Sequence, residues 1–141
     1  MNRTLHEQGR RLIAESERIL SRDVPGAIGD GDYNLTVRRA QEVVELALKG
    51  ALNLLCVEYP RVHDVGATFR EHLTRKRPAA DDAGMQRLED ASAWLAQARA
   101  PALYFEEEYA EADPGRALDD AQFVVGEVKR LLGLVQPAPH T

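Results

Sequence analysis

The sequence predicts an all-α protein, an up-and-down bundle of four to five helices. Apolar residues recur at helical spacing in several long segments, and no segment shows sustained alternation of apolar and polar residues. Loops rich in proline, glycine and charged residues separate these segments. A chain of 141 residues can bury one hydrophobic core. We therefore expect residues 1–134 to form a single helical domain and residues 135–141 to be a disordered tail.

The most apolar periodic segment runs from Leu35 to Cys56, and we expect it to be the central, most buried helix. At about 100° per residue, its apolar positions cover more than the single stripe of a surface helix. These positions are Val37, Ala40, Val43, Val44, Leu46, Ala47, Leu48, Ala51, Leu54 and Leu55. One narrow polar line remains, either a solvated seam or part of a site. It consists of Arg38, Glu42, Glu45, Lys49 and Asn53.

Two elements should precede the central helix. Residues 3–22 carry apolar side chains at helical spacing along one stripe, which predicts an amphipathic first helix. Residues 22–34 contain one proline, three glycines and three aspartates, so we expect a loop there. Asn34 is placed to cap the central helix, because asparagine is a favoured N-cap residue.

A calcium-like spacing occurs in this loop, at Asp30, Asp32 and Asn34. A calcium loop of the EF-hand type also needs a glycine at its sixth position and a bidentate glutamate at its twelfth. Leu35 and Gln41 occupy those positions here. We therefore expect no metal site.

Three helices should follow the central one. Pro60 suits the first turn of the next helix, because its missing N–H would be unsatisfied there anyway. A further helix is expected over residues 82–99, ended by Pro101, and the last over residues 114–134. The helix after Pro60 should face inward with Val62, Val65, Phe69 and Leu73.

Composition limits the class of partner. The chain has 18 Lys and Arg residues against 23 Asp and Glu residues, a net charge of −5, which argues against a broad electrostatic grip on nucleic acid or an anionic membrane. No apolar run approaches the length that spans a bilayer. The beginning, MNRTLHEQGRR, lacks the apolar segment of a signal peptide, and the single Cys56 cannot form an intramolecular disulfide. We expect a cytoplasmic protein.

Three segments together carry a family resemblance: RRAQEVVELALKGALNLL, EYPRVHDVGATFREHL and ALDDAQFVVGEVKRLL. From about residue 8 to residue 133, the chain resembles the HEPN domain family (higher eukaryotes and prokaryotes nucleotide-binding). The resemblance implies a HEPN-like helical bundle that commonly dimerises. It also implies a ribonuclease or toxin, or a protein paired with a small nucleotidyltransferase that acts as antitoxin. We accordingly expect a homodimer.

The chain departs from the family in one respect. Ribonuclease members carry an arginine followed four to six residues later by a histidine, which supply a cation and a general base beside the scissile phosphate. No such pair occurs in this chain. We therefore expect a nucleotide-binding or regulatory partner of a small nucleotidyltransferase, in a toxin-antitoxin-like pair, without ribonuclease activity. The alternatives are a ribonuclease or toxin with a rearranged site, using His63 or His72 as base, and a purely structural helical interaction module.

The candidate site lies along the polar line of the central helix. Its four-residue spacings are explained most simply by exposed ion pairs, each worth only ~0.2–0.5 kcal/mol. The sharper hypothesis is that the following segment folds back onto this line and forms a polar cluster. Such a cluster would fix the helix packing or would orient a nucleotide phosphate on Lys49. No cofactor other than such an unidentified nucleotide is expected. The residues of this hypothesis are Arg38, Glu42, Glu45, Lys49, His63 and Asp64.

Overall fold

In the computed structural model, residues 4–104, 109 and 112–134 are described, and they form helices and connections with no β-strand. The predicted all-α class is therefore confirmed. The predicted tail, residues 135–141, lies outside the described residues. The elements are α1 (Leu5–Arg18), η1 (Ile19–Asp23), α2 (Val24–Gly29), α3 (Tyr33–Leu54), α4 (Gly66–Lys76), η2 (Pro78–Ala80), α5 (Ala83–Leu103) and α6 (Ala112–Leu131).

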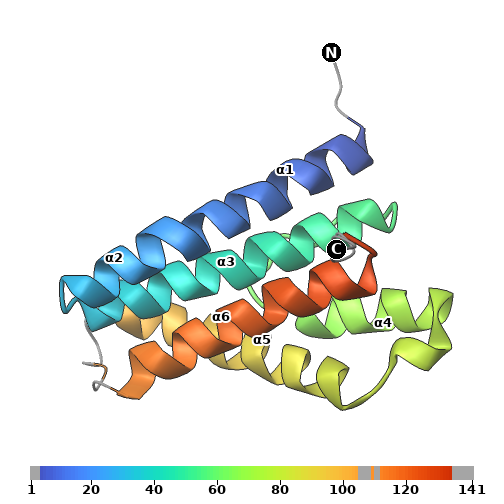
Figure 1. The fold of residues 1–141 in the computed structure, drawn as a ribbon. Coiled ribbons are helices and arrows are strands. Elements are labelled where there is room, and N and C mark those ends of the chain that lie inside the picture. The colour runs from blue at the N-terminus through green and yellow to red at the C-terminus, as the bar shows by residue number, and fades with distance from the viewer. Residues whose placement is uncertain (1–3, 105–108, 110–111, 135–141) are drawn as a thin grey trace, which may run out of the picture.

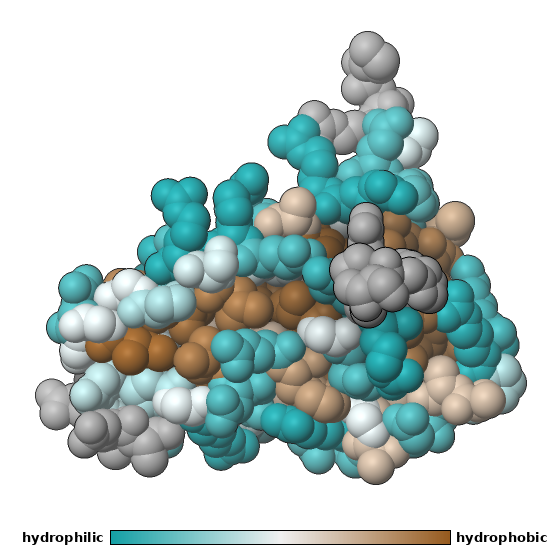
Figure 2. All heavy atoms as spheres, viewed as in Figure 1, coloured by the Kyte–Doolittle hydropathy of each residue, from teal (hydrophilic) through white to brown (hydrophobic). Residues whose placement is uncertain are grey.

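Helix α3 is the axis of an up-and-down bundle (Figure 1). Helices α1 and α5 run in one direction, and α3 and α6 run in the other. The space-filling view shows a band of apolar residues between α1–α2 and α6, flanked by polar residues (Figure 2). None of the described helices is both long and apolar enough to cross a membrane.

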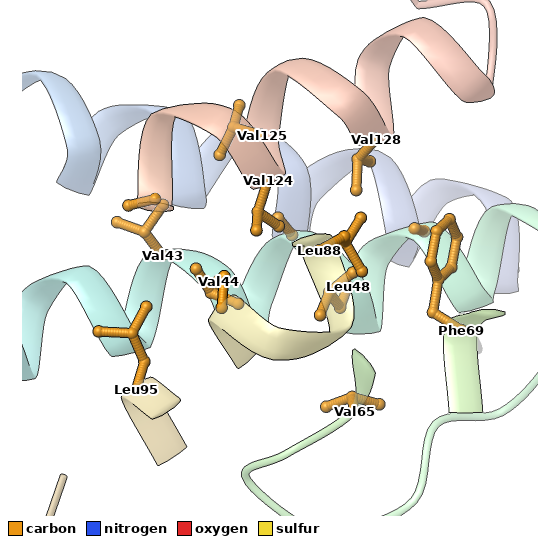
Figure 3. Packing of buried hydrophobic residues seen from close by; sticks show 14 of the residues in the cluster. Val43, Val44, Leu48, Val65, Phe69, Leu88, Leu95, Val124, Val125 and Val128 are labelled. Atoms are coloured by element: carbon orange, nitrogen blue, oxygen red, sulfur yellow. The ribbon is translucent and has the colours of Figure 1, made fainter. Parts of the chain in front are cut away.

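The hydrophobic core gathers around α3, as the periodicity predicts. Val43, Val44 and Leu48 of α3 meet side chains from α4, α5 and α6 (Figure 3). Of the ten apolar positions predicted on this helix, Leu46 and Leu54 are partly exposed and the others are buried. Because the single chain covers nearly all of the apolar surface of α3, that surface gives no reason of its own for a dimer.

The first helical segment is longer than predicted. The prediction of a loop over residues 22–34 is wrong up to Gly29, because these residues are helical. Helix α1 continues through the π-helical turn η1 into α2, which ends at Gly29. Pro25 explains the π turn, because a proline has no N–H to donate to the preceding turn. The N–H of Val24 donates instead to the carbonyl of Ile19, five residues back, and the widened turn lets the helix continue.

The predicted cap of the central helix is also wrong. The N-cap is Asp32, whose Oδ1 accepts from the N–H of Leu35 at 3.0 Å. Asn34 lies inside α3 and is buried. Its side chain donates to the carbonyl of Ala102 at 3.2 Å and accepts from the N–H of Tyr109 at 3.2 Å. Asn34 therefore ties the start of α3 to the end of α5.

Two further boundaries differ from the prediction. Pro101 does not end α5, because the helix continues to Leu103. The carbonyl that Pro101 leaves without a helical donor belongs to Gln97, an exposed residue whose carbonyl can bind water. The helix expected from Pro60 begins only at Gly66, and the expected inward residue Val62 is 49% exposed. Residues 57–65 are irregular because their side chains bind neighbouring helices, as described below.

Two basic residues at the end of α4 bind the C-terminal ends of two other helices. Lys76 Nζ donates to the carbonyl of Leu55, at the end of α3, and Arg77 Nη1 donates to the carbonyl of Leu131, at the end of α6. Cations are favourable at helix C-termini, where the last carbonyl groups lack helical donors. These residues therefore stabilise the bundle.

Helices α5 and α6 are joined by two cation–π contacts. The guanidinium of Arg116 lies 3.9 Å from the centroid of the Trp94 ring, and that of Arg87 lies 3.9 Å from the Phe123 centroid. Between them Asp120 carries a mostly buried carboxylate, 3.8 Å from Arg116 Nε. Trp94 therefore covers a neighbouring helix of its own chain.

Candidate functional site

A row of polar side chains runs along one side of α3, and we call it the α3 polar row. Residues at four-residue spacing lie above one another on a helix. Gln41 Nε2 donates to Glu45 Oε1 at 2.8 Å, and Lys49 Nζ donates to Glu45 Oε2 at 2.7 Å. The members of the row are Gln41, Glu45, Lys49 and Asn53.

The predicted polar line is therefore partly right. Glu45, Lys49 and Asn53 belong to the row. Glu42 and the half-buried Arg38 take no part in the hydrogen bonds that join Gln41, Glu45 and Lys49. Glu42 is paired at 2.8 Å with Arg39, three residues before it, and not with Arg38 as the spacing suggested.

Residues 57–65 fold back over the α3 polar row, and we call them the covering segment. His63 Nδ1 lies 2.7 Å from Glu45 Oε1 and donates to it, because an ionised carboxylate can only accept. The ring of Tyr59 lies over Lys49, whose Nζ is 5.1 Å from the ring centroid. The hydroxyl of Tyr59 accepts from Gln8 Nε2 of α1 at 3.1 Å. The expected approach of His63 to Glu45 is thus present, although an irregular segment and not a helix brings it about.

Asp64 is not brought into this cluster. Its Oδ1 accepts from the hydroxyl of Ser92 on α5 at 2.7 Å and from the N–H of Gly66 at 3.3 Å. A side chain on Gly66 would meet the Cβ atom of Ser92 at 2.8 Å, so α4 begins in close contact with α5. Asp64 therefore fixes the start of α4 and stands apart from the predicted site.

Glu45 is the centre of the cluster. Its side chain is 17% exposed, that of Lys49 is 12% exposed, and that of His63 is 54% exposed. Burial opposes ionisation of Glu45, but hydrogen bonds from Gln41, Lys49 and His63 outweigh it, so the pKa of Glu45 is below its ordinary value. The cluster therefore holds Glu45 as a carboxylate.

Two pockets flank the cluster. The first, of about 230 Å³, we call the Gln41 pocket, and it is lined by Gln41, Glu42, Glu45, Leu46, His63 and Arg99. The second, of about 260 Å³, we call the Asn53 pocket, and it is lined by Leu5, Gln8, Asn53, Glu58, Tyr59 and Arg61. Each pocket contains one end of the α3 polar row.

Six polar residues of this site were not predicted: Gln8, Gln41, Glu58, Tyr59, Arg61 and Arg99. Gln41 could have been found, because it lies four residues before Glu45 and so continues the row. No spacing in the sequence indicates Tyr59, Gln8 or Arg99. They lie on the covering segment, α1 and α5, which reach α3 only when the chain folds. Within the described part of the chain, no group of three or more His, Cys, Asp or Glu side chains is placed to hold a metal ion.

Replacing Glu45 with glutamine should destabilise the protein by roughly 1–3 kcal/mol at neutral pH, the usual effect of losing hydrogen bonds to a charged group. Because the folded-state pKa of Glu45 is lowered, its stabilisation is full above the ordinary value of 4.5. It is lost as the pH falls through the lower folded-state pKa. Urea unfolding of wild type and Glu45→Gln at neutral and acidic pH measures this difference.

Asp120→Asn is the matched control, because its carboxylate is about as buried, with 15% of the side chain exposed. Burial raises the pKa of Asp120, and Asp119 adds to the effect, while Arg116 and Arg87 oppose it. Ionisation of Asp120 therefore costs stability in the folded state. Asp120→Asn should leave the free energy of unfolding at neutral pH unchanged or higher, and an equal loss in both variants would contradict the assigned role of Glu45.

The comparisons with known proteins agree with the fold and with the resemblance. The family model of the HEPN domain matches residues 7–132, from within α1 to just past the end of α6. The comparisons with curated proteins and with solved structures gave no match. Since the matched segment contains nearly all of the bundle, the chain belongs to the HEPN domain family.

Proposed function

We propose that this chain is a nucleotide-binding HEPN protein with a regulatory role in the cytoplasm, and that it does not cleave RNA. Membership of the family supports a protein of the nucleotide-binding or ribonuclease kind. The observation that carries the proposal is the Asn53 pocket, where the ring of Tyr59, the amides of Gln8 and Asn53 and the cation of Arg61 line one cavity. An aromatic face with a few placed polar groups suits a nucleotide.

We assign Lys49 a different role from the phosphate contact that the sequence suggested. Its ammonium group is mostly buried and is balanced by Glu45 at 2.7 Å. An ammonium group that is already paired offers little free charge to a phosphate. Arg61 is exposed and lines the Asn53 pocket, so we assign the phosphate contact to Arg61. Lys49 then holds the ring of Tyr59 in place through the cation–π contact.

The arrangement of the histidines supports the absence of ribonuclease activity. His72 follows Arg70 by two residues on α4, but Arg70 already binds Asp81 at 2.7 Å and Glu89 at 2.8 Å. An arginine held by two carboxylates is a poor partner for the developing charge of a scissile phosphate.

Calorimetric titration of the purified chain with AMP tests nucleotide binding. We expect saturable binding, weakened roughly tenfold or more by Arg61→Ala, since hydrogen bonds between charged groups are worth ≈ 1.5–3 kcal/mol. Arg22→Ala is the control, because Arg22 is exposed and lies on η1, outside both pockets. No heat of binding with wild type, or equal weakening by both variants, would contradict the proposed site.

A second function is favoured by one observation. His63 and Arg99 line the same pocket, so the base and the cation of a ribonuclease are close in space although their spacing in the sequence is not that of the family. Glu45 holds the Nδ1 atom of His63, which is the way a carboxylate orients a catalytic histidine. The carboxylates of Glu42 and Glu45 in this pocket oppose phosphate binding, and we therefore place this ribonuclease function second.

We also propose a homodimer and a small nucleotidyltransferase partner in a toxin-antitoxin-like pair. Both proposals rest on the family. Sedimentation equilibrium should give about twice the monomer mass of 15.7 kDa. A nucleotidyltransferase encoded in the adjacent reading frame, which co-purifies with this chain, is the result expected for the second.

A further inference from the structure

The middle of the covering segment is held to the bundle by side chains alone, and we call residues 58–64 the lid. In the described part of the chain, the backbone groups of the lid make no hydrogen bond with another backbone group. Its two ends are fixed, because the N–H of Val57 donates to the carbonyl of Leu52 at 2.9 Å and Val65 has no exposed surface. A segment with so few backbone hydrogen bonds can open locally while the rest of the protein stays folded.

Side-chain hydrogen bonds join the lid to three helices, namely Tyr59 to α1, His63 to α3 and Asp64 to α5. The bond from His63 differs from the other two, because histidine is the side chain that ordinarily changes its charge between about pH 5 and pH 8. Its acceptor Glu45 stays a carboxylate throughout this range, since the pKa of Glu45 is lowered. The strength of this one bond therefore depends on pH.

The surface beneath the lid is polar. Glu45 and Lys49 are mostly buried there, and the ring of Tyr59 lies over the ammonium group of Lys49. Opening the lid gives up this cation–π contact, but it brings charged groups to water and leaves the hydrophobic core closed. Lys49 Nζ becomes accessible when the lid opens, so its chemical reactivity reports the opening.

The charged groups around His63 decide how its protonation acts. Glu45 of α3 accepts from Nδ1 at 2.7 Å, and Glu42 of α3 and Arg99 of α5 line the same pocket as the imidazole. A protonated His63 adds an ion pair with Glu45 to that hydrogen bond, whereas the neutral ring keeps the hydrogen bond alone. Glu42 and the neighbouring Asp64 attract the same charge, and Arg99 repels it. Protonation therefore strengthens the attachment of the lid to α3.

The Asn53 pocket is formed partly by the lid. Tyr59 and Arg61 of the lid line it from one side, and Gln8 of α1 and Asn53 of α3 line it from the other. A ligand that contacts both sides binds the closed form alone. Its binding therefore shifts the lid toward the closed form.

Resting on the proposed nucleotide-binding function for its ligand, we propose that the lid opens from α3 while the bundle stays folded, and that the bond from His63 to Glu45 is its latch. A ligand in the Asn53 pocket closes the lid. Protonation of His63 tightens the latch, so access to the pocket is linked to pH in the range in which histidines titrate.

Acetylation of the lysine side chains, read by mass spectrometry, measures the opening without any ligand. Lys129 of α6, with 33% of its side chain exposed, is the internal reference for Lys49. We expect a rate of Lys49 acetylation that stays constant in dilute urea, because a local opening exposes little surface. A rate that rises steeply with urea, in parallel with global unfolding, would overturn the lid.

Substitutions of His63 test the latch. In wild type the Lys49 rate, divided by that of Lys129, should fall about two- to fivefold from about pH 8 to pH 6, the range expected for an exposed ion pair. The division removes the pH dependence that both amines share. His63→Gln has no titrating group and should show no such fall, whereas His72→Gln, on α4 outside the lid, should behave as wild type. Equal pH responses of wild type and His63→Gln would overturn the latch.

AMP separates this inference from the proposed function. Lys49 lies outside the lining of the Asn53 pocket, so slower acetylation of Lys49 with AMP present reports closure of the lid. We expect the rate to fall in proportion to the occupancy measured by calorimetry. Binding of AMP with an unchanged Lys49 rate would overturn closure by the ligand alone. Absence of AMP binding would overturn the proposed function and closure by a nucleotide, and the opening and the latch are decided by the experiments without ligand.

Discussion

Replacing Leu48 with aspartate should unfold this protein. Leu48 lies in the middle of α3 and has no exposed surface, and it packs among side chains of α5 and α6 (Figure 3). The substitution removes a buried leucine side chain, a loss of about 2–5 kcal/mol, and buries a carboxylate without a partner, which costs several kcal/mol more. This total is comparable to the roughly 5–15 kcal/mol that stabilise a typical domain. Circular dichroism should show loss of the helical signal.

Two variants control this result. Leu48→Met keeps the volume and the apolar character, and should cost less than about 1.5 kcal/mol. Leu46→Asp introduces the same charge two residues away, at a position that is partly exposed, and should remain folded. A folded Leu48→Asp protein would contradict the central place of α3 in the core.

Replacing Gly50 with alanine should also have a large effect, because α1 crosses α3 at this residue. A Cβ atom on Gly50 would lie 2.7 Å from the carbonyl oxygen of Gly9 and 2.8 Å from Ile13 Cγ1. Since a backbone oxygen cannot rotate away, the helices must separate, and we expect a loss of roughly 1–3 kcal/mol, the typical cost of overpacking. Thermal unfolding should show the midpoint lowered.

Gly126→Ala is the matched control for this contact. Gly126 lies in α6 and is exposed, and a Cβ atom added to it would meet nothing within 4 Å. Alanine should stabilise the helix there by roughly 0.5–1 kcal/mol. Opposite signs for the two substitutions are the expected result, and a stabilised Gly50→Ala protein would show that α1 and α3 are not in close contact.

The sequence was most informative where a periodic pattern was long. The 22-residue helix α3 and its inward residues follow from apolar spacing, because the burial of one face decides both. Prolines were misleading at three places. The helix expected to begin at Pro60 begins only at Gly66. Pro25 and Pro101 lie within continuous helices. A π turn accommodates the first, and the second leaves one carbonyl of α5 without a helical donor.

The candidate site was only partly predictable. Glu45 and Lys49 follow from their spacing within one helix, and the approach of His63 follows from a chain that turns back after α3. Tyr59 and Arg99 could not be assigned to the site from the sequence, because no local sequence pattern indicates which loop or helix packs against α3. Asp64 was misplaced for the same reason, since its partner Ser92 lies 28 residues further along the chain.

We propose that this member of the HEPN family does not cleave RNA, and an RNA digestion assay tests this most directly. The assay uses wild type, His63→Ala, His72→Ala and Arg99→Ala, each with and without added magnesium. We predict no cleavage above background in any sample, because no arginine and histidine have the family spacing and Arg70 is held by two carboxylates. Robust cleavage by wild type that His63→Ala and Arg99→Ala abolish would contradict the claim and would identify the base and the cation.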